Sequence, residues 1–176
     1  MPFSSVMNHV KSVLDGLVFP AGLTLDGVTQ VPNLKALIAI ESGLTFSAQP
    51  LAFIWGGVLD IKRRTMGGPR SAAINTTSPF RNITYKMQVT VRYSVPSSLS
   101  NIDSIFPLII DSVVMQLSCT LMPIVTSDAM TGWQSTFSEI GESFDISVPN
   151  AFTHADQRWR AYGARVVTTI REDYQQ

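Results

Sequence analysis

The side chains with the clearest chemical potential form a basic cluster at residues 60–70, DIKRRTMGGPR. Cations beside a glycine-rich break can contact phosphate, nucleic acid or an acidic protein surface. A phosphate-binding loop needs a Gly-Lys-Ser/Thr or G-x-G-x-x-G pattern, and this stretch has neither. The cluster therefore favours a contact with nucleic acid or with another protein. Its basic members are Lys62, Arg63, Arg64 and Arg70.

Residues that could support catalysis or bind a metal are scattered along the chain. The two histidines, His9 and His154, lie in unrelated surroundings, and Cys119 has no partner at metal-ligand spacing. No serine occupies a G-x-S-x-G elbow. Asp103 and Asp111 are eight residues apart in one expected helix, and that spacing does not define an acid–base pair. The sequence predicts a non-enzymatic protein with no metal and no cofactor.

The sequence also bears on the compartment in which the protein is made. Its N-terminus lacks a basic region followed by an apolar core, which predicts no signal peptide. The apolar runs are shorter than the ~20 residues of a membrane span. Cys119 is the only cysteine, which excludes an intrachain disulfide, and its apolar surroundings predict a buried, inert thiol. Sequons at Asn75 and Asn82 are then attributed to chance, and the expected compartment is cytoplasm-like.

Charge is unevenly distributed although the formal net charge is zero. Residues 61–102 contain seven basic residues and no acid, whereas residues 103–157 contain seven acids and no lysine or arginine. Three interpretations stay open: scattered surface ion pairs, a head-to-tail interface between copies, or a nucleic-acid contact. The residues expected at an interface or a lumen are Lys62, Arg63, Arg64, Arg70, Arg81, Glu139, Glu142 and Asp145.

The most regular pattern is a strict alternation of apolar and polar residues over 83–95. It predicts a long strand with one face on a core and one face in water. Residues 50–65 predict a preceding strand, in which Gly56-Gly57 marks a bulge or bend. Together these strands predict a long projecting hairpin with its tip at about 62–82. Tyr85 and Tyr93 could stack on bases, but they fall on the apolar face of the alternation.

Helices are predicted at the start and in the middle of the chain. Apolar residues at helical spacing predict an amphipathic helix from Phe3 that ends near Gly16. A turn-rich linker leads from it to a short buried strand at 34–40. The second helix, over about 100–121, is apolar on more than one side. Pro107 leaves two alternatives for it, namely a first turn that ends there or a kink.

The order of these elements defines the expected fold. Residues 133–149 predict a strand broken by Gly141, and residues 159–170 predict a closing strand. With 176 residues, 45% of them hydrophobic, the chain is expected to form a single domain, 1–176. The predicted class is α+β: a mainly antiparallel sheet, two helices packed on one face, and the projecting hairpin.

Several segments resemble the tail-terminator (tail-completion) proteins of long-tailed bacteriophages and the related head–tail connector proteins. The similarity is one of layout and covers most of the chain. The long hairpin and the stretch NAFTHADQ (150–157) depart from the family pattern. The matching segments are the N-terminal helix, VPNLKALIAI, IKRRTMGGPR, YSVPSSLSNIDSIFPLIIDSVVMQL, TGWQSTFSEIGESFDI and RWRAYGARVVTTIRE.

The resemblance implies a non-enzymatic virion subunit that forms a ring, commonly a homohexamer. Such a ring caps the tail tube, ends its polymerisation and offers the joining surface for the head-completion or connector protein. DNA passes through the lumen without specific binding, and no membrane is involved. A head-completion (neck) or tail tube protein is the alternative within this class. From another class, the alternative is a small nucleic-acid-binding module that uses the basic hairpin.

Overall fold

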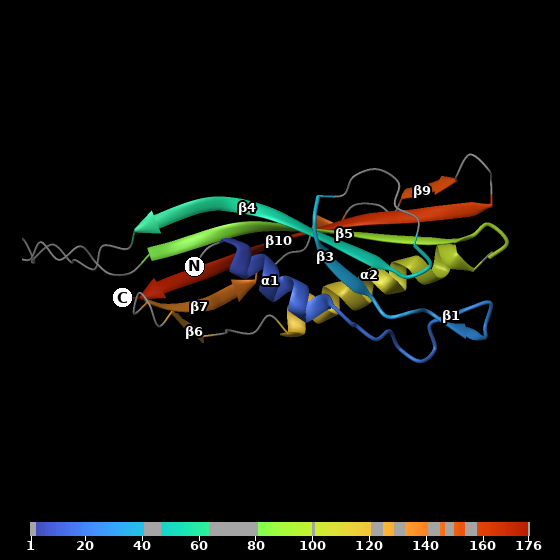
Figure 1. Ribbon diagram of the computed structural model, residues 1–176, viewed down its shortest axis with the longest axis horizontal. Helices are drawn as coiled ribbons and strands as arrows, with labels where there is room; N and C mark the ends of the chain where they lie inside the picture. Colours follow the sequence, from blue (N-terminus) through green and yellow to red (C-terminus); the bar gives the residue numbers. More distant parts are fainter. Residues whose placement is uncertain are drawn as a thin grey trace, which may run out of the picture.

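Three long antiparallel strands dominate the structure (Figure 1). The computed structural model describes residues 3–40, 47–63, 81–99, 101–120, 125–128, 133–140, 145–146, 150–153 and 158–175. The three strands are β4 (Leu51–Arg63), β5 (Arg81–Pro96) and β10 (Trp159–Gln175), of 13, 16 and 17 residues. In Figure 1 they run along the longest axis, and their left-hand ends extend past the first helix.

The main sheet has the strand order β3-β4-β5-β10-β7-β6, and β8 and β9 also pair with β10. Only β3 and β4 pair in parallel in this sheet, as far as the described residues go; the other strand pairs are antiparallel. With two helices beside it, the predicted mainly antiparallel α+β class is confirmed. The shorter strands are β3 (Lys35–Ile38), β6 (Val125–Asp128), β7 (Trp133–Ile140), β8 (Asp145–Ile146) and β9 (Asn150–Thr153).

The alternation in β5 places its apolar residues on one buried face. Tyr85, Met87, Val89, Val91, Tyr93 and Val95 are each at most 1% exposed. The polar positions are less uniform than predicted, because Lys86 is exposed but Thr90 and Ser94 are buried. Phe53, in register with Thr90, is buried as well. The prediction of one wet face is therefore wrong for this part of the sheet.

Two helices supply the other half of the core. Helix α1 (Phe3–Leu14) contacts β3 and β4, helix α2 (Ile102–Thr120) contacts β5 and β10, and the helices contact each other. Fully burying one aliphatic side chain contributes about 1.5–3 kcal/mol, so this cluster is a major source of stability. It joins Val6, Val10 and Leu14 of α1 to Ile102, Phe106, Ile109, Val113 and Leu117 of α2 and to the apolar face of β5.

The predicted end of the first helix is confirmed. Gly16 adopts φ 82°, a left-handed conformation that glycine tolerates best, and its N–H donates to the Leu34 carbonyl at 2.9 Å. The carboxylate of Asp15 accepts bonds from the Lys11 ammonium at 2.7 Å and from the Ala36 N–H at 3.0 Å. These contacts join the end of α1 to the start of β3.

Two local predictions need correction. Helix α2 continues through Pro107, so its first turn does not end there. The missing proline N–H would have bonded the carbonyl of Asp103, an exposed residue whose carbonyl water can reach. Gly56 and Gly57 stay in register with β5, and the register shift comes later, between Val58 and Asp60.

The linker after α1 contains a small hairpin that the sequence prediction missed. Strands β1 (Thr24–Leu25) and β2 (Thr29–Gln30) pair antiparallel. Asp26 and Gly27 between them have φ 52° and 72°, the conformation that an Asp-Gly turn favours. The Asp26-Gly27 dipeptide was therefore the signal in the sequence that could have predicted this hairpin.

Gly163 is a position where an added side chain would displace Arg92. A Cβ built there would lie 2.8 Å from Cζ of Arg92, its register partner on β5. We expect Gly163→Ala to displace the half-buried Arg92 and lower the free energy of unfolding by only about 0.5–1 kcal/mol in urea titrations, because the end of a flexible side chain can shift at small cost. The matched control is Gly57→Ala on β4, where nothing lies within 4 Å, and we expect it to be neutral or slightly stabilising. Equal losses in both variants would contradict this explanation.

Asp15 should make stability depend on pH. Bonds from the Lys11 side chain and from the Ala36 N–H lower the pKa of Asp15 below its ordinary value of 3.8. The folded-state pKa thus lies below the unfolded one, so the stabilisation is complete above about pH 4 and disappears as the pH falls through the folded-state pKa. We expect Asp15→Asn to be less stable than the parent at pH 6 and the difference in urea midpoints to shrink as the pH falls below about 4. A constant difference would contradict a role for the charge.

Candidate assembly surfaces

The basic candidates of the hairpin lie at one end of the main sheet. Lys62 and Arg63 are the last residues of β4, and Arg81 is the first residue of β5. The strand register places Arg63 opposite Arg81. Arg64 and Arg70 lie outside the described residues.

The acidic candidates lie on the other side of β10. Glu139 in β7 is in register with Arg171 of β10, and Asp145 in β8 is in register with Val167. Glu142 lies outside the described residues. Neighbouring strands are about 4.7–4.9 Å apart. The strand of Glu139, β7, is therefore three steps, about 14 Å, from β4 with Lys62 and Arg63, and two steps, about 10 Å, from β5 with Arg81. The sheet therefore holds these basic and acidic candidates on different strands instead of bringing them together.

Among the residues that the structure describes, strand β4 has an outer partner over only part of its length. Its partner β3 pairs only with Leu51–Ile54, and no other strand of the described residues pairs with that side of Trp55–Arg63. An open edge presents unpaired N–H and C=O groups to any strand that approaches. Residues 55–63, called the basic edge below, include Asp60, Lys62 and Arg63 and have a net charge of +1.

The opposite margin of the sheet has a second open stretch. Strand β6 pairs with residues 133–136 of β7, which leaves residues 137–140 without an outer strand among those described. Strand β8 follows on the same side of β10. Residues 137–140 and 145–146, called the acidic edge below, include Glu139 and Asp145 and no base. The two margins of one sheet thus carry opposite net charge.

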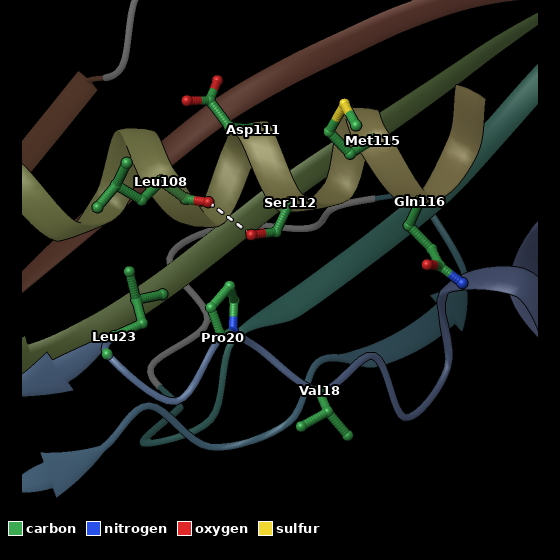
Figure 2. A pocket seen from close by; sticks show the side chains of 9 residues that line it. Val18, Pro20, Leu23, Leu108, Asp111, Ser112, Met115 and Gln116 are labelled. Carbon is green, nitrogen blue, oxygen red and sulfur yellow. Dashed lines mark hydrogen bonds between the residues drawn. The ribbon is translucent and has the colours of Figure 1, made fainter. Parts of the chain in front are cut away.

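Helix α2 exposes a second apolar surface, as its sequence predicted. Leu108 and Met115 are 48% and 61% exposed, and Val18, in the segment after α1, is 68% exposed. Figure 2 shows α2 on one side and this segment on the other side of a hollow of about 620 Å³. We call it the α2 groove. It is lined by Val18, Pro20, Gly22, Leu23, Leu108, Asp111, Ser112, Met115 and Gln116.

The residues of the α2 groove that precede β1 were not predicted as a site. Pro20 and Leu23 belong to a stretch that the sequence suggested only as a linker, and Val18 lies directly before it. The available signal was the apolar run LVFPAGL directly after a helix end. Its position opposite α2 depends on the fold and could not be deduced from that run.

The two aspartates of α2 have different surroundings and do not form an acid–base pair. Eight helical residues span about 12 Å, which is too far for a shared proton. Asp103 accepts a 2.8 Å hydrogen bond from the Tyr162 hydroxyl, and burial together with this bond raises the pKa of Tyr162. Asp111 is exposed and lines the α2 groove.

The other residues with potential chemistry are dispersed or buried. Burial lowers the pKa of His9, while His154 lies outside the described residues. No group of three or more potential metal ligands occurs in the described part of the chain. Tyr85 and Tyr93 are each 1% exposed, and burial raises the pKa of Tyr93 to about 12. These two rings are core residues and cannot stack on bases from solution.

Over the helical residues that the structure describes, neither helix is long and apolar enough to cross a membrane. No protein-family model matches the chain, and no curated protein is significantly similar to it in sequence.

Proposed function

We propose that this chain is the subunit of a closed protein ring, and that the ring is a phage tail terminator. The observation that carries the proposal is the pair of open sheet margins, one basic and one acidic. Because the two margins differ, contact between them joins unlike surfaces of successive copies. Such head-to-tail contacts give a ring when the rotation between copies closes.

The backbone supports this mode of contact. Strand β4 has 13 residues, and four of them pair with β3. The remaining nine form the basic edge, which extends about 30 Å at ~3.3 Å per residue. Pairing it with the acidic edge of a neighbour would satisfy main-chain groups that each copy leaves open. Lys62 and Arg63 would then approach Glu139 and Asp145 of the next copy, which favours the correct order of subunits.

The position at the end of a tail is supported by the sequence resemblance. A ring built in this way presents two different faces, one for the tail tube protein and one for the head-completion or connector protein. It would cap the last tube ring, stop polymerisation and leave a lumen for DNA. A hexamer is the expected size, and the virion is the expected location.

The test combines oligomeric state with tail-tube binding. Size-exclusion chromatography with light scattering should give a closed oligomer, either alone or after addition of tail tubes, and electron microscopy should place it at one tube end. Binding along the whole tube, or only to purified connectors, would indicate the tube or neck role instead. A monomer that binds short DNA tightly, with affinity that falls steeply with salt, would overturn the structural role.

A further inference from the structure

We infer that the α2 groove holds residues 64–80 of a neighbouring copy, the segment that joins β4 to β5. The inference rests on the proposed ring, and it names the surface on which the hairpin of the next subunit docks. Three observations support it: the groove is held open, its charge argues against a symmetric contact, and the segment cannot reach the groove of its own chain.

Hydrogen bonds hold the groove open from both ends. The Gln116 side-chain amide donates to the Val13 carbonyl at 3.2 Å, which fixes α2 to the end of α1. The Asn101 amide donates to the Thr24 carbonyl at 3.3 Å and fixes the start of α2 to β1. Gln30 donates to the Pro20 carbonyl at 3.1 Å and braces the segment between them. A preformed apolar hollow loses less entropy when a partner binds than a flexible one does.

The size and lining of the groove suit a few side chains of a peptide. Its volume of about 620 Å³ lies in the usual ~300–1,000 Å³ range of ligand pockets. Exposed Met115 and Leu108 offer apolar contact, and methionine adapts readily to different partners. Asp111 is the only charged residue in the lining, so a segment with apolar and basic side chains is complementary.

The charge of α2 argues against a symmetric pair of grooves. The helix contains Asp103 and Asp111 and no basic residue. A twofold contact through the groove would place the two copies of Asp111 near each other without a neutralising cation, which is unfavourable. The partner surface must therefore be basic. Residues 64–80 meet this requirement, because they contain Arg64 and Arg70, the apolar Met66 and Ile74, and no acid.

The groove of the same chain lies out of reach of this segment. Figure 1 shows the end of β4 and the start of β5 at the left, whereas α2 lies in the right half of the molecule. Strand β4 covers about 30 Å between Ile54 and Arg63. The 17 residues from 64 to 80 start and end at the paired Arg63 and Arg81, so their midpoint reaches at most about 30 Å back. The groove lies near the opposite end of β4, because Leu34 bonds Leu17 and Lys35 bonds Pro50, next to Leu51. Leu51 is about 40 Å from Arg63 at ~3.3 Å per residue. This exceeds the reach of the segment, which leaves a second copy as its host.

Peptide binding tests the groove independently of ring formation. A fluorescent peptide of residues 61–81 is titrated into the full-length protein and followed by anisotropy. We expect saturable, salt-sensitive binding that weakens at least tenfold with Met115→Lys or Asp111→Lys, and that is retained with Met115→Leu. The matched control for the introduced cation is Ile40→Lys, since Ile40 is 63% exposed and outside the lining. Absence of saturable binding, or equal weakening by Ile40→Lys, overturns the inference.

Photocrosslinking identifies the partner in the assembled protein. A benzoylphenylalanine at position 115 is expected to crosslink to residues 64–80, and mixed isotope-labelled and unlabelled copies should give labelled–unlabelled pairs. Crosslinks within one copy only, or to another region, overturn the inference.

The proposed ring has a separate readout: if Met115→Lys leaves closed rings intact, the groove inference fails and the ring stands. If the parent protein forms no ring with or without tail tubes, the ring fails, whereas peptide binding still reports on the groove.

Discussion

Reversing the charge of the basic edge is expected to abolish ring formation. In Lys62→Glu combined with Arg63→Glu, the end of β4 would face Glu139 and Asp145 of the neighbour with like charge. Like-charge contacts in an interface cost several kcal/mol, so association should weaken at least ~100-fold. Light scattering would report a monomer, and infection assays should give no completed virions. The control is Lys86→Glu, an exposed base on the inner strand β5, which should assemble normally.

A reciprocal variant makes this experiment specific to the two edges. Glu139→Lys with Asp145→Lys should also be monomeric, because its acidic edge would then repel the basic edge of the next copy. Mixed in equal amounts, the two variants present complementary edges to each other and should form rings in which they alternate. Native mass spectrometry can count both species in each ring. Rings from either variant alone, or no rescue on mixing, would show that these edges do not meet.

Truncating the core beneath α2 is expected to cause the largest loss of stability. Phe106 is 1% exposed, and its ring centroid lies 5.6 Å from that of Tyr162 on β10. Phe106→Ala leaves a cavity between helix and sheet, and such changes lower the free energy of unfolding by about 3–5 kcal/mol. Urea denaturation followed by circular dichroism measures the difference directly.

Leu108 on the same helix provides the matched comparison. It is 48% exposed and lines the α2 groove instead of the core. We expect Leu108→Ala to change the free energy of unfolding by less than about 0.5–1 kcal/mol and to weaken binding of the 61–81 peptide. A large stability loss in Leu108→Ala would mean that the groove belongs to the core.

The elements with a strong internal period could be predicted from the sequence. The alternation over 83–95 predicted β5, and helical spacing predicted both helices, because burial of one face imposes those periods on single segments. Features that depend on neighbours were missed. Thr90 and Ser94 are buried although they occupy the polar positions of β5, and the register shift lies between Val58 and Asp60 because β5 decides the pairing.

The candidate assembly surfaces also combine features that single segments determine with features that depend on neighbouring segments. The basic run at 61–102 and the acidic run at 103–157 can be read directly from the sequence, because they depend only on the order of the residues. Their separation across β4, β5, β10 and β7 was not predictable, because it depends on which strands pair. In the described part of the chain, Trp55–Arg63 has no outer strand because β3 pairs with Leu51–Ile54 only. The α2 groove arises from a linker folded against a helix.

The position of β10 has a consequence for the order in which the protein folds. It follows all of its partners in the chain, yet it lies between β5 on one side and β7, β8 and β9 on the other. During synthesis β5 therefore has no neighbour on this side until β10 has left the ribosome. Pairing over such long sequence separations is slow, and strand edges exposed in the meantime are prone to aggregate. The newly made chain therefore depends most on chaperones in the interval before its closing strand is inserted.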